Sequence, residues 1–167
     1  MNLVKPSVYD ELYREEQFTK YECLLKLGVK LSGTVLDAGC GTGLLHEYMR
    51  SVLGELNAKY VCLDPDPGML RVARNRVKSP LSILIEGYAE DLPLREEVFD
   101  AVLSITTWGA LSREPRSLVE LKRVTRRGGI IVVTGHPRTF TRQPCDLDKD
   151  FQHVGSCIDY FYVAYKK

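Results

Sequence analysis

Short runs of apolar residues recur along the chain and alternate with segments of helical spacing. The runs rich in β-branched and apolar residues predict buried strands at 34–38, 60–64, 81–86, 98–104 and 130–134. Helices are predicted between these strands, beginning at Leu44, near Met69 and at Glu114. Strands that alternate with helices indicate a parallel sheet covered on both faces. The fold class is therefore α/β, a doubly wound, mostly parallel sheet.

The amino-terminal segment departs from this alternation. Residues 7–27 have a partly helical apolar spacing, which predicts an amphipathic helix broken near Glu15 and ended by Gly28. The next predicted helix, from Glu114 to Thr125, is expected to turn an apolar stripe toward the sheet. That stripe consists of Leu118, Val119, Leu121 and Val124.

The carboxyl-terminal segment is short for a sheet of this kind. Residues 135–149 contain proline, arginine and polar residues without a helical period, so no helix is expected there. Residues 151–157 predict a short sixth strand, and residues 158–165 predict a last, antiparallel strand. We divide one domain, residues 1–167, into a helical cap (1–30), a core (31–134) and a shortened tail (135–167).

Composition narrows the class of protein. The net charge of +1 gives no overall basic field for nucleic acid. The sequence shows no signal peptide and no apolar run near the ~20 residues of a membrane helix. The five cysteines are an odd number without a Cys-x-x-Cys pair, which favours a reduced, cytoplasmic protein over a disulfide framework. No cluster has metal-ligand spacing, so no metal is expected.

The first predicted strand runs into a glycine-rich turn, Asp37-Ala38-Gly39-Cys40-Gly41-Thr42-Gly43. A dinucleotide-binding turn has the spacing Gly-x-Gly-x-x-Gly and binds a diphosphate at the following helix. Here the glycines alternate, and the carboxylate of Asp37 would repel a diphosphate. The turn suits a ligand with an ammonium group and no phosphate, and S-adenosylmethionine (SAM) is such a ligand.

The string Val-Leu-Asp-Ala-Gly-Cys-Gly-Thr-Gly, residues 35–43, resembles the first motif of class I SAM-dependent methyltransferases. The segments at 87–94 and 121–129 are also similar to that family. The pattern most resembles the type 11, small-molecule group that includes quinone-biosynthesis enzymes. This resemblance covers roughly residues 8–134 and the last strand.

The predicted cofactor site combines spacing with this resemblance. Asp64 ends the second strand about twenty residues after the glycine turn, where an acid accepts ribose hydroxyls. The resemblance implies that Met69 packs on the adenine. It also places the adenine amine against the Ala89 backbone and either Glu90 or Asp91, because Tyr88 replaces the family's usual acid. The complete predicted set is Asp37, Ala38, Gly39, Cys40, Gly41, Asp64, Pro65, Met69, Ala89, Glu90 and Ser104.

The sequence does not identify a catalytic residue, but His136, Trp108 and Tyr13 are candidates. His136 follows the fifth strand and could serve as a general base, or it is a loop histidine without a role. Trp108 follows the fourth strand and would wall the acceptor pocket, with a core position as the alternative. Tyr13 and Tyr9 could cover the sulfonium with their ring faces, or they are packing residues.

The resemblance implies methyl transfer from SAM to a small-molecule acceptor, with S-adenosylhomocysteine as the product. One alternative is an RNA or tRNA methyltransferase. Its motive is the set of basic residues on the helix after Asp64 and in the loop after the fifth strand: Arg71, Arg74, Arg76, Lys78, Arg138 and Arg142. The chain lacks the Asn-Pro-Pro-Tyr motif of enzymes that methylate exocyclic amines. A second alternative is a non-catalytic subunit with the SAM fold.

The short tail also predicts assembly. Without a helix in residues 135–149, Tyr160, Phe161, Tyr162, Val163 and Tyr165 would leave apolar surface open. We therefore expect a homodimer or a partner-dependent subunit, and no association with a membrane.

Overall fold

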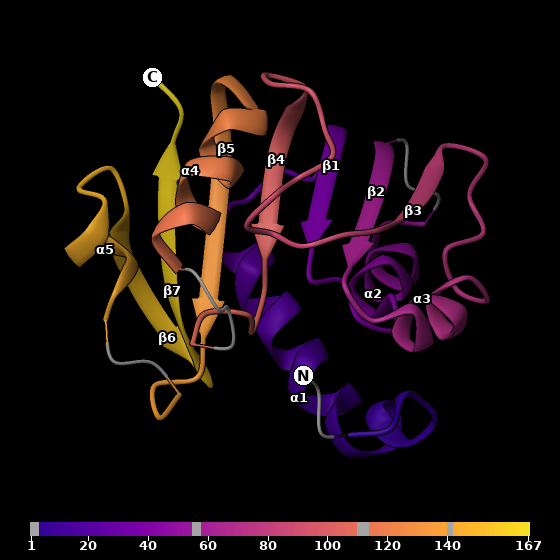
Figure 1. The fold of residues 1–167 in the computed structure, drawn as a ribbon. Helices are drawn as coiled ribbons and strands as arrows, with labels where there is room; N and C mark the ends of the chain where they lie inside the picture. Colours follow the sequence, from indigo (N-terminus) through magenta and orange to yellow (C-terminus); the bar gives the residue numbers. More distant parts are fainter. Residues whose placement is uncertain (1–3, 55–57, 110–113, 140–141) are drawn as a thin grey trace.

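The computed structural model describes residues 4–54, 58–109, 114–139 and 142–167. Its strands form one sheet of seven in the order β3-β2-β1-β4-β5-β7-β6 (Figure 1). The strands are β1 (Gly33–Ala38), β2 (Ala58–Asp64), β3 (Ser82–Glu86), β4 (Phe99–Ser104), β5 (Thr125–Gly135), β6 (Gln152–Cys157) and β7 (Asp159–Tyr165). The helices are α1 (Pro6–Lys26), α2 (Leu44–Leu53), α3 (Pro67–Ala73), α4 (Glu114–Val124) and α5 (Pro144–Leu147).

The topology confirms the predicted α/β class. Strands β1 to β5 pair in parallel, whereas β7 runs antiparallel to both β5 and β6. The carboxyl ends of the parallel strands therefore lie at one edge of the sheet, which is the lower edge in Figure 1. The antiparallel tail strands extend the sheet beyond β5, as the sequence predicted.

Helices cover both faces of the sheet because alternate strand residues are apolar on both sides. Val35 and Leu103 pack on one face with α1, α2 and α3. Leu36 and Val102 pack on the other face with α4. Figure 1 shows α4 in front of the sheet, with α1 and α2 behind it.

Helix α1 lies where the sequence predicted a helix, but the predicted break near Glu15 is wrong. Pro6 starts the helix at a position where a missing N–H costs nothing, and Gly28 follows its end with a φ of 77°. The helix continues through Glu15 without interruption. Its buried side chains include Gln17 and Lys20, so its inner face is partly polar, and hydrophobic spacing alone describes it poorly.

Helix α4 also differs in one position from the predicted apolar stripe. Leu118, Leu121 and Val124 are buried, as expected. Val119 is 63% exposed, and Ser117 is buried on the sheet side instead. The small serine fits against the sheet because its hydroxyl donates to the carbonyl of Glu114, 2.8 Å away.

The tail covers its own strands more completely than the sequence predicted. Phe161, Tyr162 and Val163 are buried, whereas Tyr165 is 62% exposed. Tyr162 belongs to the same core cluster as Phe151, and α5 contributes partly buried residues to that cluster. The short α5, which the sequence did not predict, therefore takes over part of the role of a longer helix.

The cysteines contradict the expectation of a fully reduced chain. Cys40 is disulfide-bonded to Cys62, and Cys23 is bonded to Cys157, leaving Cys145 free. The first pair forms because β1 and β2 lie side by side, which brings the two Cα atoms within 5.4 Å. The cysteine count therefore does not support a reducing compartment. In the part of the chain that the structure describes, no helix is both long and apolar enough to cross a bilayer.

Candidate cofactor site

The glycine turn between β1 and α2, residues 39–43, forms the cofactor loop. The loop is fastened to the end of β2, because the N–H groups of Gly39 and Cys40 both donate to the carbonyl of Leu63, at 2.7 and 3.0 Å. Gly39 and Gly41 have φ values of 85° and 55°, which side chains other than glycine rarely adopt. The alternating glycines thus serve a backbone that turns tightly beside the neighbouring strand.

Asp64 ends β2 next to this loop and is 8% exposed. One carboxylate oxygen accepts the N–H of Gly41 at 2.9 Å, and the other accepts the N–H of Asp66 at 2.9 Å. Burial raises the pKa of Asp64, and these two backbone bonds oppose that rise. Each oxygen has a further lone pair, so a carboxylate held this way can still accept ribose hydroxyls.

Asp37, on β1, lies deeper than Asp64. The hydroxyl of Tyr60 donates to its carboxylate, a partner that the sequence did not indicate. Burial raises the pKa of Asp37 to about 7, although the bond from Tyr60 acts in the opposite direction. None of the ion pairs among the described residues includes Asp37. A buried acid without a cationic partner suits the ammonium group of a ligand.

Ser104 connects β4 to the cofactor loop. Its hydroxyl donates to the carbonyl of Ala38 at 3.0 Å and lies 2.6 Å from the hydroxyl of Thr107. The methyl group of Thr107 lies 2.6 Å from where a Cβ on Gly39 would be. The loop therefore needs glycine at position 39, because Thr107 occupies the space of a side chain.

The other predicted adenine contacts lie around the end of β3. The N–H of Gly87 donates to the carbonyl of Asp64 at 3.2 Å, so the segment that continues to Ala89 and Glu90 begins beside Asp64. Ala89 and Glu90 are buried, Met69 is buried on α3, and Pro65 is exposed in the turn before that helix.

Helix α1 crosses this edge of the sheet and is fastened to the cofactor loop. Arg76 binds the carboxylates of Asp10 and Glu47 and donates to the carbonyl of Thr42 at 2.8 Å. The hydroxyl of Thr42 donates to Asp10 at 2.6 Å. The basic residue that motivated the RNA hypothesis thus has an internal role. We call Asp10, Thr42, Glu47 and Arg76 the latch.

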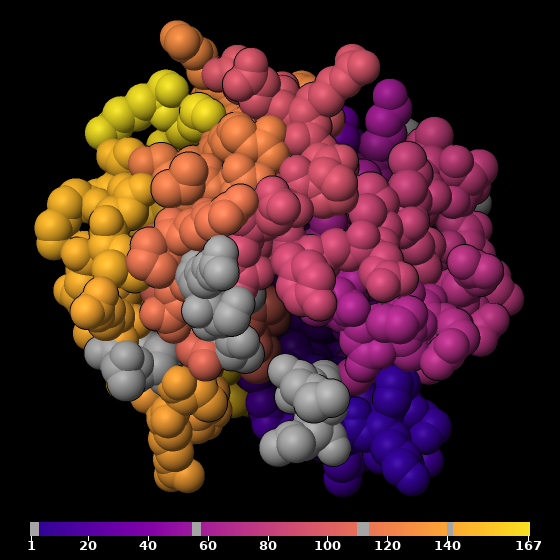
Figure 2. All heavy atoms as spheres, viewed as in Figure 1, coloured from indigo at the N-terminus to yellow at the C-terminus, as the bar shows by residue number. Residues whose placement is uncertain are grey.

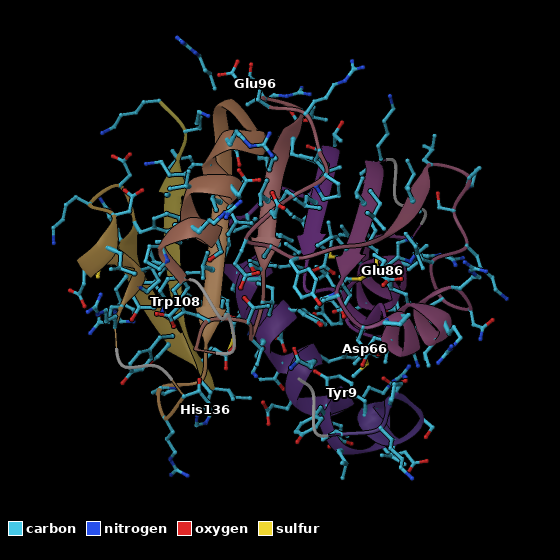
Figure 3. All side chains as sticks on the ribbon, in the orientation of Figure 1. Tyr9, Asp66, Glu86, Glu96, Trp108 and His136 are labelled. Carbon is cyan, nitrogen blue, oxygen red and sulfur yellow. A yellow bond between two sulfur atoms is a disulfide. The ribbon has the colours of Figure 1, made fainter. Side chains whose placement is uncertain are left out.

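Tyr9 and Tyr13 lie on this helix with their ring centroids 5.0 Å apart. Burial raises the pKa of Tyr9 to about 12, with smaller contributions from Tyr13 and from acids that include Asp64. Figure 3 shows Tyr9 and Asp66 at the edge where the parallel strands end, opposite Glu96. Figure 2 shows the surface hollowed at this edge, with part of the indigo α1 visible inside.

The structure shows the surroundings of two catalytic candidates, Trp108 and His136. Trp108 is 1% exposed, and its indole N–H donates to the carbonyl of Arg142 at 2.7 Å. It packs with α4 in the core, which is the alternative that the sequence left open beside a pocket wall. His136 is partly exposed, and its Nδ1 accepts the N–H of Arg138 at 3.2 Å.

Several residues of this edge carry no sequence signal. Tyr60 is one aromatic residue of a strand, and Arg76 is one of several basic residues near α3. Both were brought to the site by packing between distant segments. Only the acid at the end of β2 and the glycine turn have a spacing that could identify them.

The fold and this edge define a class I SAM-dependent methyltransferase. A loop fastened to the adjacent strand, a strand-end carboxylate beside it and a buried acid without a cation fit an adenosine carrying an amino-acid ammonium. A family model described as a methyltransferase domain, type 11, matches residues 36–133. The chain belongs to this family, whose cofactor is SAM.

Similar proteins agree with this assignment. The chain is 39% identical over 112 residues to the malonyl-[acyl-carrier protein] O-methyltransferase of Serratia marcescens, covering 66% of this chain and 42% of that protein. It is 34% identical over 116 residues to the demethylmenaquinone methyltransferase of Tropheryma whipplei, covering 68% and 47%. The chain thus spans less than half the length of these relatives.

A solved structure shows the same fold over nearly the whole chain. It is the complex between the Haloferax volcanii Trm112 methyltransferase activator and a methyltransferase. The two chains superpose with a TM-score of 0.76 at 15% identity, covering 97% of this chain and 93% of the other.

Proposed function

We propose that this protein transfers a methyl group from SAM to a small-molecule acceptor, releasing S-adenosylhomocysteine. One observation carries the proposal: Asp64 is fixed by Gly41 at the end of β2, beside a loop that leaves no room for side chains at position 39. The names of the two enzyme relatives support an acceptor other than nucleic acid.

The residues of the site would divide the binding of SAM between them. Asp64 would accept the ribose hydroxyls, and Asp37 would face the ammonium group. Ala38, Gly39, Cys40 and Gly41 would contact the amino-acid portion through their backbone. A second group would contact the adenine and its surroundings: Pro65, Met69, Ala89, Glu90 and Ser104.

SAM supplies a sulfonium-bound methyl group that a nucleophile can displace in line. The protein's contribution is then mainly position and exclusion of water. Helix α1, held over the strand ends by the latch, would close the site, and Tyr9 would place its ring against the cation. Asp37, Asp64 and Tyr9 therefore have proposed binding roles, and no residue is assigned as a base.

Calorimetry of the purified protein with SAM, S-adenosylhomocysteine and NAD tests the proposal. Binding of both adenosyl ligands without binding of NAD is expected, because the alternating glycines lack the Gly-x-Gly-x-x-Gly spacing of a turn that binds a diphosphate. Binding of NAD without SAM would refute it. Screening small carboxylic acids, quinols and tRNA with radiolabelled SAM then separates the acceptor classes, and tRNA binding would weaken steeply with salt.

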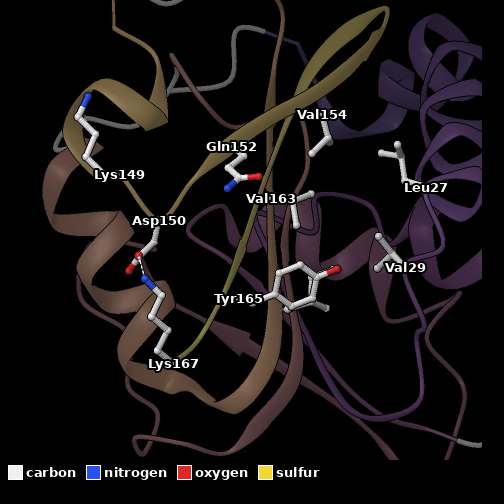
Figure 4. A pocket seen from close by; sticks show the side chains of 10 residues that line it. Leu27, Val29, Lys149, Asp150, Gln152, Val154, Val163, Tyr165 and Lys167 are labelled. Carbon is white, nitrogen blue, oxygen red and sulfur yellow. Dashed lines mark hydrogen bonds and ion pairs between the residues drawn. The ribbon is translucent and has the colours of Figure 1, made fainter.

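We further propose that the chain assembles with a second copy or a protein partner. Figure 4 shows a groove of about 290 Å³ between the end of α1 and the β6–β7 hairpin. Leu27, Val154 and Tyr165 line it and are substantially exposed. Lys167 at its rim is paired with Asp150 at 2.9 Å. The complex of the structural neighbour with an activator protein supports a partner as one form of this assembly.

A further inference from the structure

A buried polar cluster lies between α1 and the sheet, outside the predicted cofactor contacts. Its members are Lys20 on α1, Thr106 after β4, Thr134 on β5 and Asp159 at the start of β7. The side chains of Lys20 and Asp159 are both 0% exposed, and the Lys20 Nζ lies 3.0 Å from the Asp159 Oδ1. Lys20 also binds Glu16, at 2.6 Å. The cluster joins four segments that are distant in the sequence.

Asp159 is the final acceptor of the hydrogen bonds within the cluster. Asp159 Oδ2 accepts the hydroxyls of Thr106 and Thr134, both at 2.8 Å. Thr134 in turn accepts the backbone N–H of Thr106 at 2.7 Å, and Thr106 accepts from Lys20 at 3.2 Å. Thr106 is thus held by its side chain and by its backbone at once.

These hydrogen bonds hold the backbone of Thr106 in an unusual conformation. Its φ is 58°, in the left-handed region that a β-branched residue rarely adopts. Such a conformation persists only where the surrounding structure enforces it, and it clusters at functional sites. Here the enforcing groups are Asp159 and Thr134. The Thr106 hydroxyl also accepts from Lys20 at 3.2 Å and from Gln17 at 3.3 Å, both on α1.

The segment that follows Thr106 contacts the cofactor loop. The N–H groups of Thr107 and Trp108 both donate to the carbonyl of Thr134 at 3.1 Å. Thr107 then lies on Gly39 and beside Ser104. A change in the conformation of Thr106 would therefore move the residue that packs on the cofactor loop.

We propose that Lys20 and Asp159 are positioning residues that act through Thr106. They hold residues 106–108 against Gly39 and so couple the cap helix α1 to the cofactor site. A buried ion pair contributes little to stability compared with apolar residues of the same size, so stability alone does not account for this pair. The inference rests on the proposed binding of SAM at the cofactor loop.

The test replaces Asp159 by asparagine, which keeps the shape and removes the charge. We expect Asp159→Asn to bind S-adenosylhomocysteine about tenfold more weakly than the wild type by calorimetry. The emission of Trp108 should also shift to longer wavelength in the ligand-free protein. Trp108 is the only tryptophan of the chain, so its emission reports on this segment directly.

The matched control is Asp150→Asn, which removes another ion-paired aspartate, one that binds Lys122 and Lys167. It should leave both the affinity and the emission unchanged. If Asp159→Asn lowers only the melting temperature, with affinity within twofold of the wild type and unchanged emission, the pair is merely structural and the inference is wrong. If Asp159→Asn does not fold, Thr134→Val removes the same connection and should give the same two changes.

A second variant tests the route through Thr106. Glycine adopts a φ of 58° without strain, so in Thr106→Gly residue 106 depends less on Asp159 to keep its backbone conformation. In that background, Asp159→Asn should weaken binding less than threefold, whereas equal losses in both backgrounds would overturn the inference. A wild type that does not bind S-adenosylhomocysteine would refute the proposed function instead, and the emission of Trp108 would still test the positioning role.

Discussion

Among single residues, Asp64 combines two roles at the end of β2. Its carboxylate organises the cofactor loop through Gly41, and we propose that its remaining lone pairs accept the ribose hydroxyls. Asp37 differs because its burial keeps the carboxyl protonated up to about pH 7 in the absence of a cation. The same burial that destabilises its charge would strengthen its attraction for an ammonium group.

Asp64→Ala should weaken SAM binding by about 1.5–3 kcal/mol, the scale of a hydrogen bond to a charged acceptor. Calorimetry measures this directly. The control is Asp66→Ala, since Asp66 accepts the N–H of Gly68 at 2.7 Å and caps α3. That variant should lose about 1 kcal/mol of stability and little affinity. Unchanged affinity in Asp64→Ala, with a collapsed melting temperature, would show that Asp64 is structural.

The pKa of Asp37 predicts a pH dependence with a definite sign. The unfolded chain releases this proton near pH 3.8, and the folded protein holds it to about 7. The free energy of unfolding contributed by Asp37 therefore falls as the pH rises between these values. Asp37→Asn lacks this proton, so its stability relative to the wild type should rise between about pH 5 and pH 7, while SAM affinity falls.

Urea unfolding at several pH values measures that difference. Asp150→Asn serves as the control, because the pKa of Asp150 is lowered to about 2 by hydrogen bonds from Lys122 and Lys167. Its contribution is lost only as the pH falls toward that value, so it should be constant in the same window. A constant difference for Asp37→Asn would contradict the raised pKa.

Helix α1 owes its position to connections at both ends. The latch joins its amino-terminal half to the cofactor loop, and Cys23 joins its carboxyl-terminal half to Cys157 on β6. The buried Lys20 lies between these two connections. The helix that is proposed to close the site is therefore fixed both to the cofactor loop and to the distant tail strands β6 and β7.

Cys157→Ser should lower the free energy of unfolding by about 2–4 kcal/mol, because the bond closes a long loop in the unfolded chain. Denaturant unfolding under oxidising conditions measures this loss. The control is Cys145→Ser, which removes the free cysteine and should have little effect. If a reductant lowers the stability of Cys157→Ser as much as that of the wild type, the Cys23–Cys157 bond does not contribute.

For the whole molecule, the groove between α1 and the β6–β7 hairpin leaves apolar side chains exposed. Strand β6 is the edge of the sheet, and most of its residues are exposed. Tyr165 is the aromatic residue of the groove lining, and it is 62% exposed. Assembly across this groove would cover both features.

Tyr165→Glu should convert the proposed assembly to monomers, because it places a charge in the apolar groove. Light scattering at increasing protein concentration measures the change. Val119→Glu is the matched control, since Val119 is equally exposed but lies on α4. A wild type that stays monomeric at all concentrations, and binds no protein in pull-downs, would refute the proposed assembly.

The sequence by itself determined the strands, the glycine turn and the acid at the end of β2. These features depend on local properties, namely apolar runs, backbone freedom at glycine and a fixed spacing between motifs. The sequence also identified the family, because residues 35–43 combine the end of an apolar strand, the acid Asp37 and the glycine turn in one continuous motif. The position of the cofactor edge followed from parallel strands alone.

Only the tertiary structure decided which distant residues meet at that edge. Tyr60 on β2 donates to Asp37 on the adjacent strand β1. Lys20 forms an ion pair with Asp159, although most of the chain separates them in the sequence. Trp108 entered the core, and four cysteines formed bonds that their number had argued against. Each outcome depends on which side chains the packed sheet brings within a few ångströms, and no local pattern carries that information.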